Sequence, residues 1–389
     1  MDFDTPIDRT GTACVKWDLH GSGVLPLWVA DMDFASPPAV VAALETRARH
    51  GVFGYALPSD AMWEALGRHL SRRYGWRVER EWVVWLPGVV TGVSLASRAF
   101  AQRGEALMLI TPAYPPFLAE LPAQGFRLVK VPSTPEGGTA PNAPLSGRSP
   151  WRLPLDEMEA ALTPDTRVFV LCHPHNPFGR VWRRNELEAV VDFCRRHDLV
   201  LCSDEIHCDL VLDALPHVPT ATLSDDAAAR TVTLMSPSKT FNLPGLNFAF
   251  AVIPDEGLRR RFTTEAEGLL PWPGCFALAA AEAAYREGGP WLEELLAYLR
   301  GNHDRVARFV AEELPGVSTT HVEATYLSWL DARGLGVPDP ARLFHDAGVA
   351  LSDGAEFDAP GFLRLNFACP RGTLDDALSR MRRAVASLR

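Results

Sequence analysis

Apolar stretches of strand length alternate with amphipathic stretches from about residue 80 onward. Helical spacing follows the first apolar stretch over residues 89–104 and recurs over residues 184–198. This rhythm is typical of βαβ units, so we expect an α/β fold with a mostly parallel sheet sandwiched by helices. The strands are predicted within residues 81–88, 105–114, 126–133, 166–179, 199–212 and 230–239.

The pattern changes near residue 275, where helices predominate and only short strand-like stretches follow. This change predicts a second, smaller α+β domain. We expect a large domain over residues 46–274 and a small domain formed by residues 1–45 and 275–389. A stretch rich in Pro, Gly and Ser over residues 133–150 predicts a surface loop.

Charge and composition narrow the possible partners. The chain has 38 basic and 48 acidic residues, a formal net charge of −10, so we expect no nucleic-acid binding. No apolar run reaches 18 residues, and the N-terminus lacks the pattern of a signal peptide, so we expect no membrane association. Seven scattered cysteines do not form a disulfide framework, which favours a cytoplasmic location.

Parallel sheets place ligands beyond the carboxyl ends of their strands, and candidate binding residues recur there. Gly88 opens a helix whose free N–H groups suit a phosphate, although in isolation a plain turn is the better explanation. Tyr114 ends the next predicted strand. Asn176 lies between prolines, either as a fixed amide donor or as a simple turn initiator.

Lys239 lies between two apolar stretches. Burial of an unpaired lysine is costly, so Lys239 is either paired or a nucleophilic amine. Asp204 follows a buried strand and could pair with Lys239, cap a helix, or hold a protonated ring nitrogen. Ser236 and Ser238 flank the lysine with hydroxyls that suit a phosphate. Together these groups match the requirements of pyridoxal phosphate.

A metal site is the competing interpretation of the sulfur- and imidazole-rich segments. Its ligands would have to come from residues that lack the usual spacing of metal-binding motifs, so we expect no metal. These residues are Cys172, His173, His175, Cys202, His207 and Cys208.

Motifs along nearly the whole chain resemble one enzyme family. The chain resembles the fold type I pyridoxal-phosphate enzymes of aminotransferase class I/II, and more narrowly the MalY/PatB branch of cystathionine β-lyases (C–S lyases). The most specific motifs are "ADMDF" (30–34), "HGVFGY" (50–55) and "SDEIHCDL" (203–210). Others, such as "HNPFGRVW" (175–182) and "SPSKTFNLPGL" (236–246), are shared more widely or add support.

The resemblance implies a role for each candidate around the cofactor ring. Lys239 would form the Schiff base, and Asp204 would keep the pyridine nitrogen protonated. Asn176 would donate to the phenolic oxygen, and His207 stands where many aminotransferases have a tyrosine that contacts the same oxygen. Tyr114 would stack on the ring.

The resemblance also implies the phosphate and substrate contacts. The phosphate would lie against the backbone amides of Val89 and Val90 and the hydroxyls of Ser236 and Ser238. Tyr55 would reach the phosphate of the neighbouring subunit, which implies a homodimer with shared active sites. Arg364 would clamp the carboxylate of a small amino-acid substrate. Its apolar flanks disfavour the alternative that it is a surface charge.

Two departures from the family pattern concern the phosphate and the substrate. Asn247 stands eight residues past the lysine, where many aminotransferases have an arginine. The stretch "GLLPWPGCF" (268–276) differs from the asparagine-containing segment expected in β-lyases.

The expected function is that of a pyridoxal-phosphate-dependent C–S β-lyase. It would cleave S-substituted, cystathionine-like L-cysteines to a thiol, pyruvate and ammonia. One alternative is an aminotransferase with the same residues. Another is a tailoring enzyme for a cysteine S-conjugate in natural-product (lincosamide-like) biosynthesis, acting by elimination or decarboxylative oxidative deamination. A regulatory protein that contacts a transcription regulator is the alternative from a different class.

Overall fold

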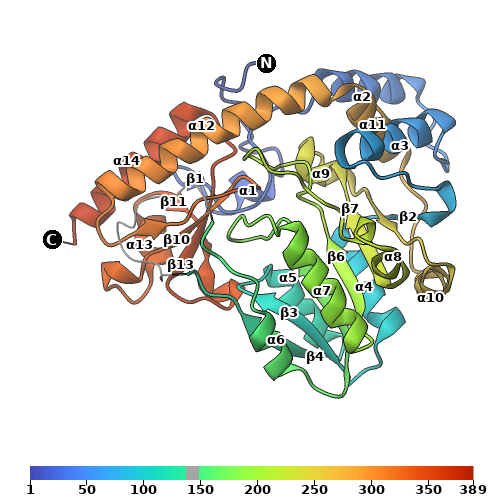
Figure 1. Cartoon of the computed structure of the whole chain (residues 1–389). Coiled ribbons are helices and arrows are strands. Elements are labelled where there is room, and N and C mark those ends of the chain that lie inside the picture. The colour runs from blue at the N-terminus through green and yellow to red at the C-terminus, as the bar shows by residue number, and fades with distance from the viewer. Residues whose placement is uncertain (137–148, 389) are drawn as a thin grey trace.

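The computed structural model describes residues 1–136 and 149–388, so most of the loop predicted over 133–150 lies outside the described residues. In the described part, the largest sheet has seven strands in the order β2-β8-β7-β6-β5-β3-β4 (Figure 1). Only β8 runs antiparallel to its neighbours, so the prediction of a mostly parallel sheet is confirmed. The strands are β2 (Val83–Leu86), β3 (Ala106–Thr111), β4 (Arg127–Pro132), β5 (Thr166–Cys172), β6 (Val200–Asp204), β7 (Thr231–Met235) and β8 (Ala249–Val252).

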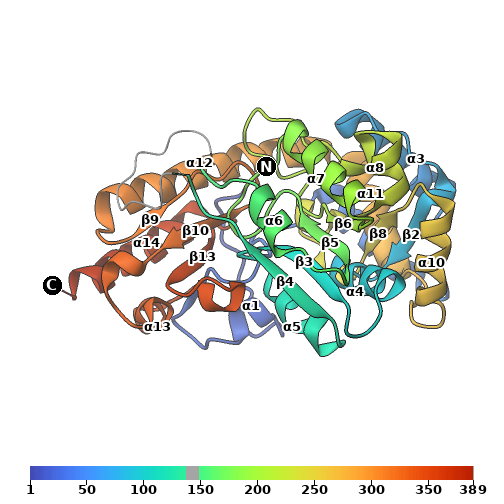
Figure 2. The same ribbon diagram turned by 60° about the horizontal axis from the view of Figure 1, so that its bottom comes forward.

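Helices cover both faces of this sheet, as the alternating pattern predicts (Figure 2). Strand β3 shows why, since all six of its residues are buried. Leu107 and Leu109 enter the core on one face, whereas Met108 and Ile110 enter the core on the other. The first face packs against α4 (Val89–Phe100), α5 (Pro115–Ala123) and α10 (Glu256–Ala266). The second packs against α6 (Leu155–Ala161), α7 (Arg184–Arg196), α8 (Asp225–Arg230), α3 (Asp60–Tyr74) and α11 (Cys275–Glu287).

A smaller antiparallel sheet lies beside the first, in the order β12-β13-β10-β9. Its strands are β9 (Ser318–Thr319), β10 (Leu327–Asp331), β12 (Ser352–Asp353) and β13 (Phe362–Asn366). It shares a core with α12 (Gly289–Glu313), α13 (Pro340–Asp346) and α14 (Arg371–Ala386). Figure 1 shows α12 as the long orange helix that extends from this smaller part toward α2 (Pro38–His50) and α11.

The N-terminal segment joins the smaller part of the molecule. Strand β1 (Leu25–Pro26) pairs in parallel with β11 (Val349–Ala350). Helix α11 begins at the predicted start of the small domain, but it packs mainly against α2 and α3. The boundaries at residues 45 and 274 therefore remain predictions. None of the helices in the described ranges is long and apolar enough to cross a membrane.

Candidate active site

A cavity of about 340 Å³ lies at the carboxyl ends of the central strands. Strands β2, β5, β6 and β7 each lead into a segment that lines it. The structure brings together most of the residues predicted from the sequence, because parallel strands end at one edge of the sheet. Those that line the cavity are Val89, Val90, Tyr114, Asn176, Asp204, His207, Ser238 and Lys239.

Lys239 lies in the short helix α9 (Pro237–Thr240), directly after β7. Its Nζ donates a hydrogen bond to the carbonyl oxygen of Ala30 at 2.6 Å. The pKa of Lys239 falls to about 8, mainly through burial and also through the charge of Arg364. The charges of Asp31 and Asp204 oppose this shift. Lys239 forms no ion pair with Asp204 within 4.0 Å. The salt-bridge interpretation of this lysine is therefore not what the structure shows.

Asp204 is the last residue of β6 and is buried. One carboxylate oxygen accepts from the backbone N–H of Ile206 at 3.1 Å, and turns rather than a helix follow. Burial is the main reason that the pKa of Asp204 rises to about 7. The hydrogen bond from the Ile206 N–H opposes this rise, the charge of Glu205 adds to it, and the charge of Lys239 opposes it. Asp204 is thus a buried carboxyl without a cationic partner among the described residues, and it can accept one from a ligand.

Arg364 lies in the centre of β13 and is 4% exposed, so it is not a surface charge. Its Nη1 donates to Asn176 Oδ1 at 3.1 Å, and its Nη2 donates to the carbonyl oxygen of Trp28 at 2.9 Å. Its Nε has no hydrogen-bond partner. Burial lowers the pKa of Arg364 to about 10, although Tyr114 and Tyr326 oppose this. No carboxylate of the described residues lies within 4.0 Å of it, which leaves the guanidinium free for an anionic ligand.

His207 adds a second unpartnered polar group to the cavity wall. Its Nδ1 is buried without a hydrogen-bond partner. The pKa of His207 falls to about 3, mainly through burial and also through the charges of Lys239 and Arg364. The imidazole is therefore neutral and can hydrogen-bond to a ligand. Within residues 1–136 and 149–388, no group of three or more His, Cys, Asp or Glu side chains is arranged to hold a metal ion.

The predicted phosphate contacts come from the start of α4 and from the two serines next to Lys239. Val89 and Val90 are the first residues of α4, and Gly88 before them offers no side-chain cap. Ser238 lines the cavity, but Ser236 does not. The Ser236 hydroxyl donates to the carbonyl oxygen of Phe248 at 2.6 Å and accepts from the Ser238 N–H at 3.0 Å. The Ser236 hydroxyl therefore caps α9, and its contact with a phosphate remains a prediction.

Tyr55 lies outside the cavity and is 96% exposed. Its ring is 6.2 Å from that of Trp272, so it lies next to the stretch 268–276 that departs from the family pattern. An exposed Tyr55 is compatible with a contact to a second subunit. That contact remains a prediction.

Sequence reasoning missed several residues around Lys239. Ala30, Asn247 and Phe248 line the cavity. In the sequence, Asn247 stands out only as a departure from the family pattern, and Ala30 only as part of the motif "ADMDF". Ala30 contributes a backbone carbonyl, which no side-chain pattern can reveal.

Known proteins are similar to this chain along nearly its whole length. Cystathionine beta-lyase PatB of Bacillus subtilis (strain 168) is 37% identical over 398 residues, covering 99% of this chain and 100% of PatB. Protein MalY of Escherichia coli (strain K12) is 33% identical and covers 100% of both chains.

Solved structures share the whole fold. The crystal structure of OvoB has a TM-score of 0.93 and 44% identity and covers 100% of both chains. Cystalysin from Treponema denticola, whose structure contains a pyridoxal 5'-phosphate cofactor, has a TM-score of 0.93 and 29% identity, covering 100% of this chain and 99% of cystalysin. The family model "Aminotransferase class I and II" matches residues 22–381. The chain therefore belongs to the aminotransferase class I and II family, in the MalY and PatB branch that its motifs indicate.

Proposed function

We propose that this protein is a pyridoxal-phosphate-dependent C–S β-lyase that cleaves S-substituted L-cysteines to a thiol, pyruvate and ammonia. The observation that carries the proposal is the convergence of three ionisable groups that do not pair with one another. Lys239 and Asp204 line one cavity, and Arg364 reaches its wall through Asn176. Relatives named cystathionine beta-lyase support the same reaction.

The residues present fit pyridoxal phosphate. Asp204 has no cationic partner and His207 Nδ1 has no partner at all, so both can meet a polar ring. The start of α4 and the Ser238 hydroxyl suit the phosphate. Lys239 offers an amine to the aldehyde. When bound, the cofactor supplies an aldehyde that combines with amines and a ring that accepts electrons.

The protein's own residues then account for the rest of the reaction. Arg364 binds the substrate carboxylate and thereby orients the Cα–H bond. The amine of Lys239, with a pKa of about 8, is basic enough to remove the Cα proton near neutral pH. The carbon–sulfur bond breaks, and the sulfur leaves with the bonding electron pair and takes up a proton. The remaining three-carbon fragment is hydrolysed by water to pyruvate and ammonia.

We also propose a homodimer with shared active sites. Large apolar side chains are exposed next to Tyr55, which suits burial against a second copy. They include Val52, Phe53, Leu57, Leu269 and Trp272, each at least 55% exposed. Sedimentation should give twice the 42.7 kDa of one chain, and a monomeric mass would contradict the proposal. A cytoplasmic location is part of the proposal because all seven cysteines are free.

The reaction is tested by a complete product assay. The protein loaded with pyridoxal phosphate is incubated with L-cystathionine and with a panel of S-substituted L-cysteines, and free thiol, pyruvate and ammonia are quantified together. Equal amounts of all three establish β-elimination and rank the leaving groups. A 2-oxo acid or an aldehyde that still carries the sulfur would contradict the lyase and indicate transamination or oxidative deamination. The Lys239→Ala variant is the background control.

A further inference from the structure

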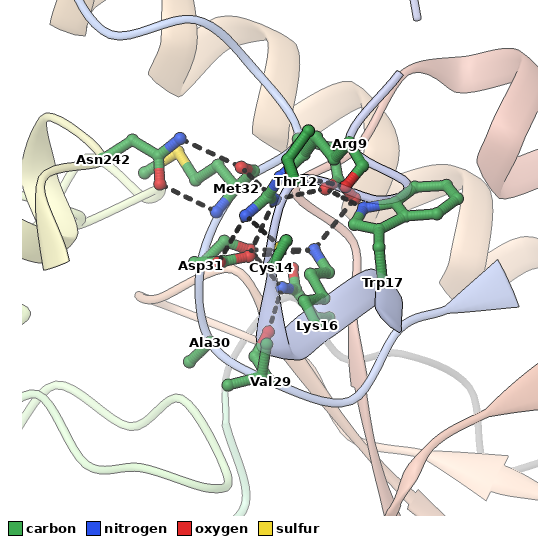
Figure 3. A network of polar contacts seen from close by, with 12 residues as sticks. Arg9, Thr12, Cys14, Lys16, Trp17, Val29, Ala30, Asp31, Met32 and Asn242 are labelled. Carbon is green, nitrogen blue, oxygen red and sulfur yellow. Dashed lines mark hydrogen bonds and ion pairs between the residues drawn. The ribbon is translucent and has the colours of Figure 1, made fainter. Parts of the chain in front are cut away.

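The segment 28–34 has no regular secondary structure and contributes Ala30 to the cavity wall. Side chains from distant elements, among them Asn242, donate to its carbonyl groups (Figure 3). The carbonyl oxygen of Ala30 accepts from Lys239 Nζ at 2.6 Å and from the Tyr326 hydroxyl at 2.9 Å. Asn366 Nδ2 donates to the carbonyl oxygens of Val29 at 2.7 Å and Asp31 at 2.6 Å. The carbonyl that receives the lysine is therefore fixed in place before any substrate arrives.

The other side of the same segment is held by charges from the N-terminus. Arg9 Nη2 pairs with Asp31 at 2.8 Å, and its Nη1 pairs with Asp33 at 2.6 Å. Lys16, which is 2% exposed, pairs with Asp33 at 2.8 Å and donates to the carbonyl oxygen of Asp31 at 3.0 Å. Figure 3 shows Arg9 and Lys16 pointing toward Asp31. Both aspartates share both cations, but only Asp31 adjoins Ala30.

Asp31 also brings a negative charge toward Lys239. Burial would raise the pKa of Asp31, but the hydrogen bonds and charges of Arg9 and Lys16 hold it below its usual value. The other groups that face the Lys239 amine are Asp204, Arg364 and the neutral His207. Arg364 disfavours the ammonium form of Lys239, whereas Asp31 and Asp204 favour it.

We propose that the Ala30 carbonyl holds the amine of Lys239 whenever that amine is free, and that Asp31, fixed by Arg9 and Lys16, is a positioning residue for it. The proposal rests on the proposed function only in taking Lys239 as the reacting amine. A neutral amine has two N–H bonds and one lone pair. One N–H bond to Ala30 leaves the lone pair available for the substrate Cα proton. The resulting ammonium still donates to the same carbonyl, so the proton is held close to where it was removed.

The lysine content of the chain allows a direct measurement. The sequence contains three lysines, which are Lys16, Lys130 and Lys239. The full-length protein without added cofactor, labelled with ¹³C at lysine Cε, should therefore give three lysine signals, among which that of Lys239 can be followed as the pH is changed. Lys130, on β4 and paired with Asp358 at the surface, serves as an internal reference. Lys239→Arg assigns the active-site signal.

Asp31→Asn removes a negative charge that faces Lys239, so the pKa of the Lys239 amine should fall by about one unit. Asp33→Asn is the matched control, because it removes an equal charge bound by the same Arg9 and Lys16 but not adjacent to Ala30. It should leave the Lys239 titration close to that of the wild type. In the loaded enzyme, the acidic limb of the kcat profile should move to lower pH for Asp31→Asn only.

A merely structural role would produce a different result. Equal shifts in the Asp31→Asn and Asp33→Asn variants, or no shift in either, would overturn the proposal. If Asp31→Asn does not fold, Tyr326→Phe replaces it, since it removes the second donor to the Ala30 carbonyl and keeps every charge. That variant should raise the pKa of Lys239, and an unchanged titration would overturn the proposal. Because the titration needs no turnover, its outcome is independent of whether pyruvate is formed.

Discussion

Two clusters of buried and half-buried charges adjoin each other in this protein, on either side of Ala30. In the N-terminal cluster, Arg9 and Lys16 face Asp31 and Asp33, and each charge has an opposite partner within 3.4 Å. In the active-site cluster, Lys239, Asp204 and Arg364 form no ion pair within 4.0 Å with any residue of the described ranges.

The pKa shifts of the two clusters have opposite senses. In the paired cluster, Arg9 and Lys16 favour the charged form of Asp31. In the unpaired cluster, burial favours the neutral form, and the pKa values move to about 8 for Lys239, about 7 for Asp204 and about 10 for Arg364. Buried charges that lack partners cost stability in the free protein. That cost is recovered when a ligand supplies the partners, which is why perturbed groups gather at functional sites.

The largest expected effect is on turnover. Lys239→Ala removes the amine that reacts, so pyruvate formation should fall by about 10⁴-fold, at the upper end for loss of an acid–base group. The protein without cofactor should melt close to the wild-type temperature, because Lys239 forms no ion pair and its loss removes only the hydrogen bond to Ala30. Lys130→Ala, at an exposed lysine, should leave both quantities unchanged. Wild-type turnover by Lys239→Ala would remove this lysine from the mechanism.

The paired cluster should respond in stability instead. Lys16→Met leaves Asp33 with one cation fewer in a buried site, and this should lower the free energy of unfolding by about 3–5 kcal/mol. Lys130→Met breaks only an exposed pair with Asp358 and should cost less than about 1 kcal/mol. Urea unfolding of both variants measures the difference. Equal losses would show that the N-terminal cluster is no stronger than a surface pair.

Arg364→Leu should separate binding from stability. Loss of the guanidinium removes charge-assisted hydrogen bonds to the substrate carboxylate, so KM should rise by about 10- to 100-fold. The unfolding midpoint should stay the same or increase, because leucine needs no partner in that pocket. A rise in KM together with marked destabilisation would mean that Arg364 mainly supports the fold.

The smallest effect is a dependence of stability on pH. The pKa of Asp204 is about 7 in the folded protein against about 3.8 unfolded, so the folded state binds more protons between these values. The cofactor-free protein should therefore lose stability from this group as the pH rises toward 7. Asp204→Asn removes that loss and should be more stable than the wild type by about 1–2 kcal/mol at pH 8 and by less at pH 5. It should also retain pyridoxal phosphate less tightly.

The same variant provides the sharpest contrast between the clusters. If Asp204→Asn destabilises the cofactor-free protein as strongly as Lys16→Met does, Asp204 has a partner in solution and the distinction between paired and unpaired charges fails. Thermal melting at pH 5 and pH 8, with and without the cofactor, distinguishes these outcomes.

The sequence by itself determined the strands, their mostly parallel arrangement and the edge at which ligands bind. Local apolar runs decide these features, and the ends of parallel strands necessarily meet at one edge. Lys239, Asp204 and Asn176 could therefore be assigned to one site from their positions after strands. The family motifs added Arg364, which the structure places against Asn176. The domain boundaries and the role of Tyr55 remain predictions.

Only the tertiary structure decided which polar groups are satisfied. Ser236 has the residue type and spacing of a phosphate ligand, but its hydroxyl is used by Phe248 and by the start of α9. Ala30 has no signal in the sequence because its contribution is a backbone oxygen, brought to Lys239 from 209 residues away. Hydrogen-bond partners and the charge state of a buried group depend on atoms that are distant in sequence. A local sequence pattern therefore cannot predict them.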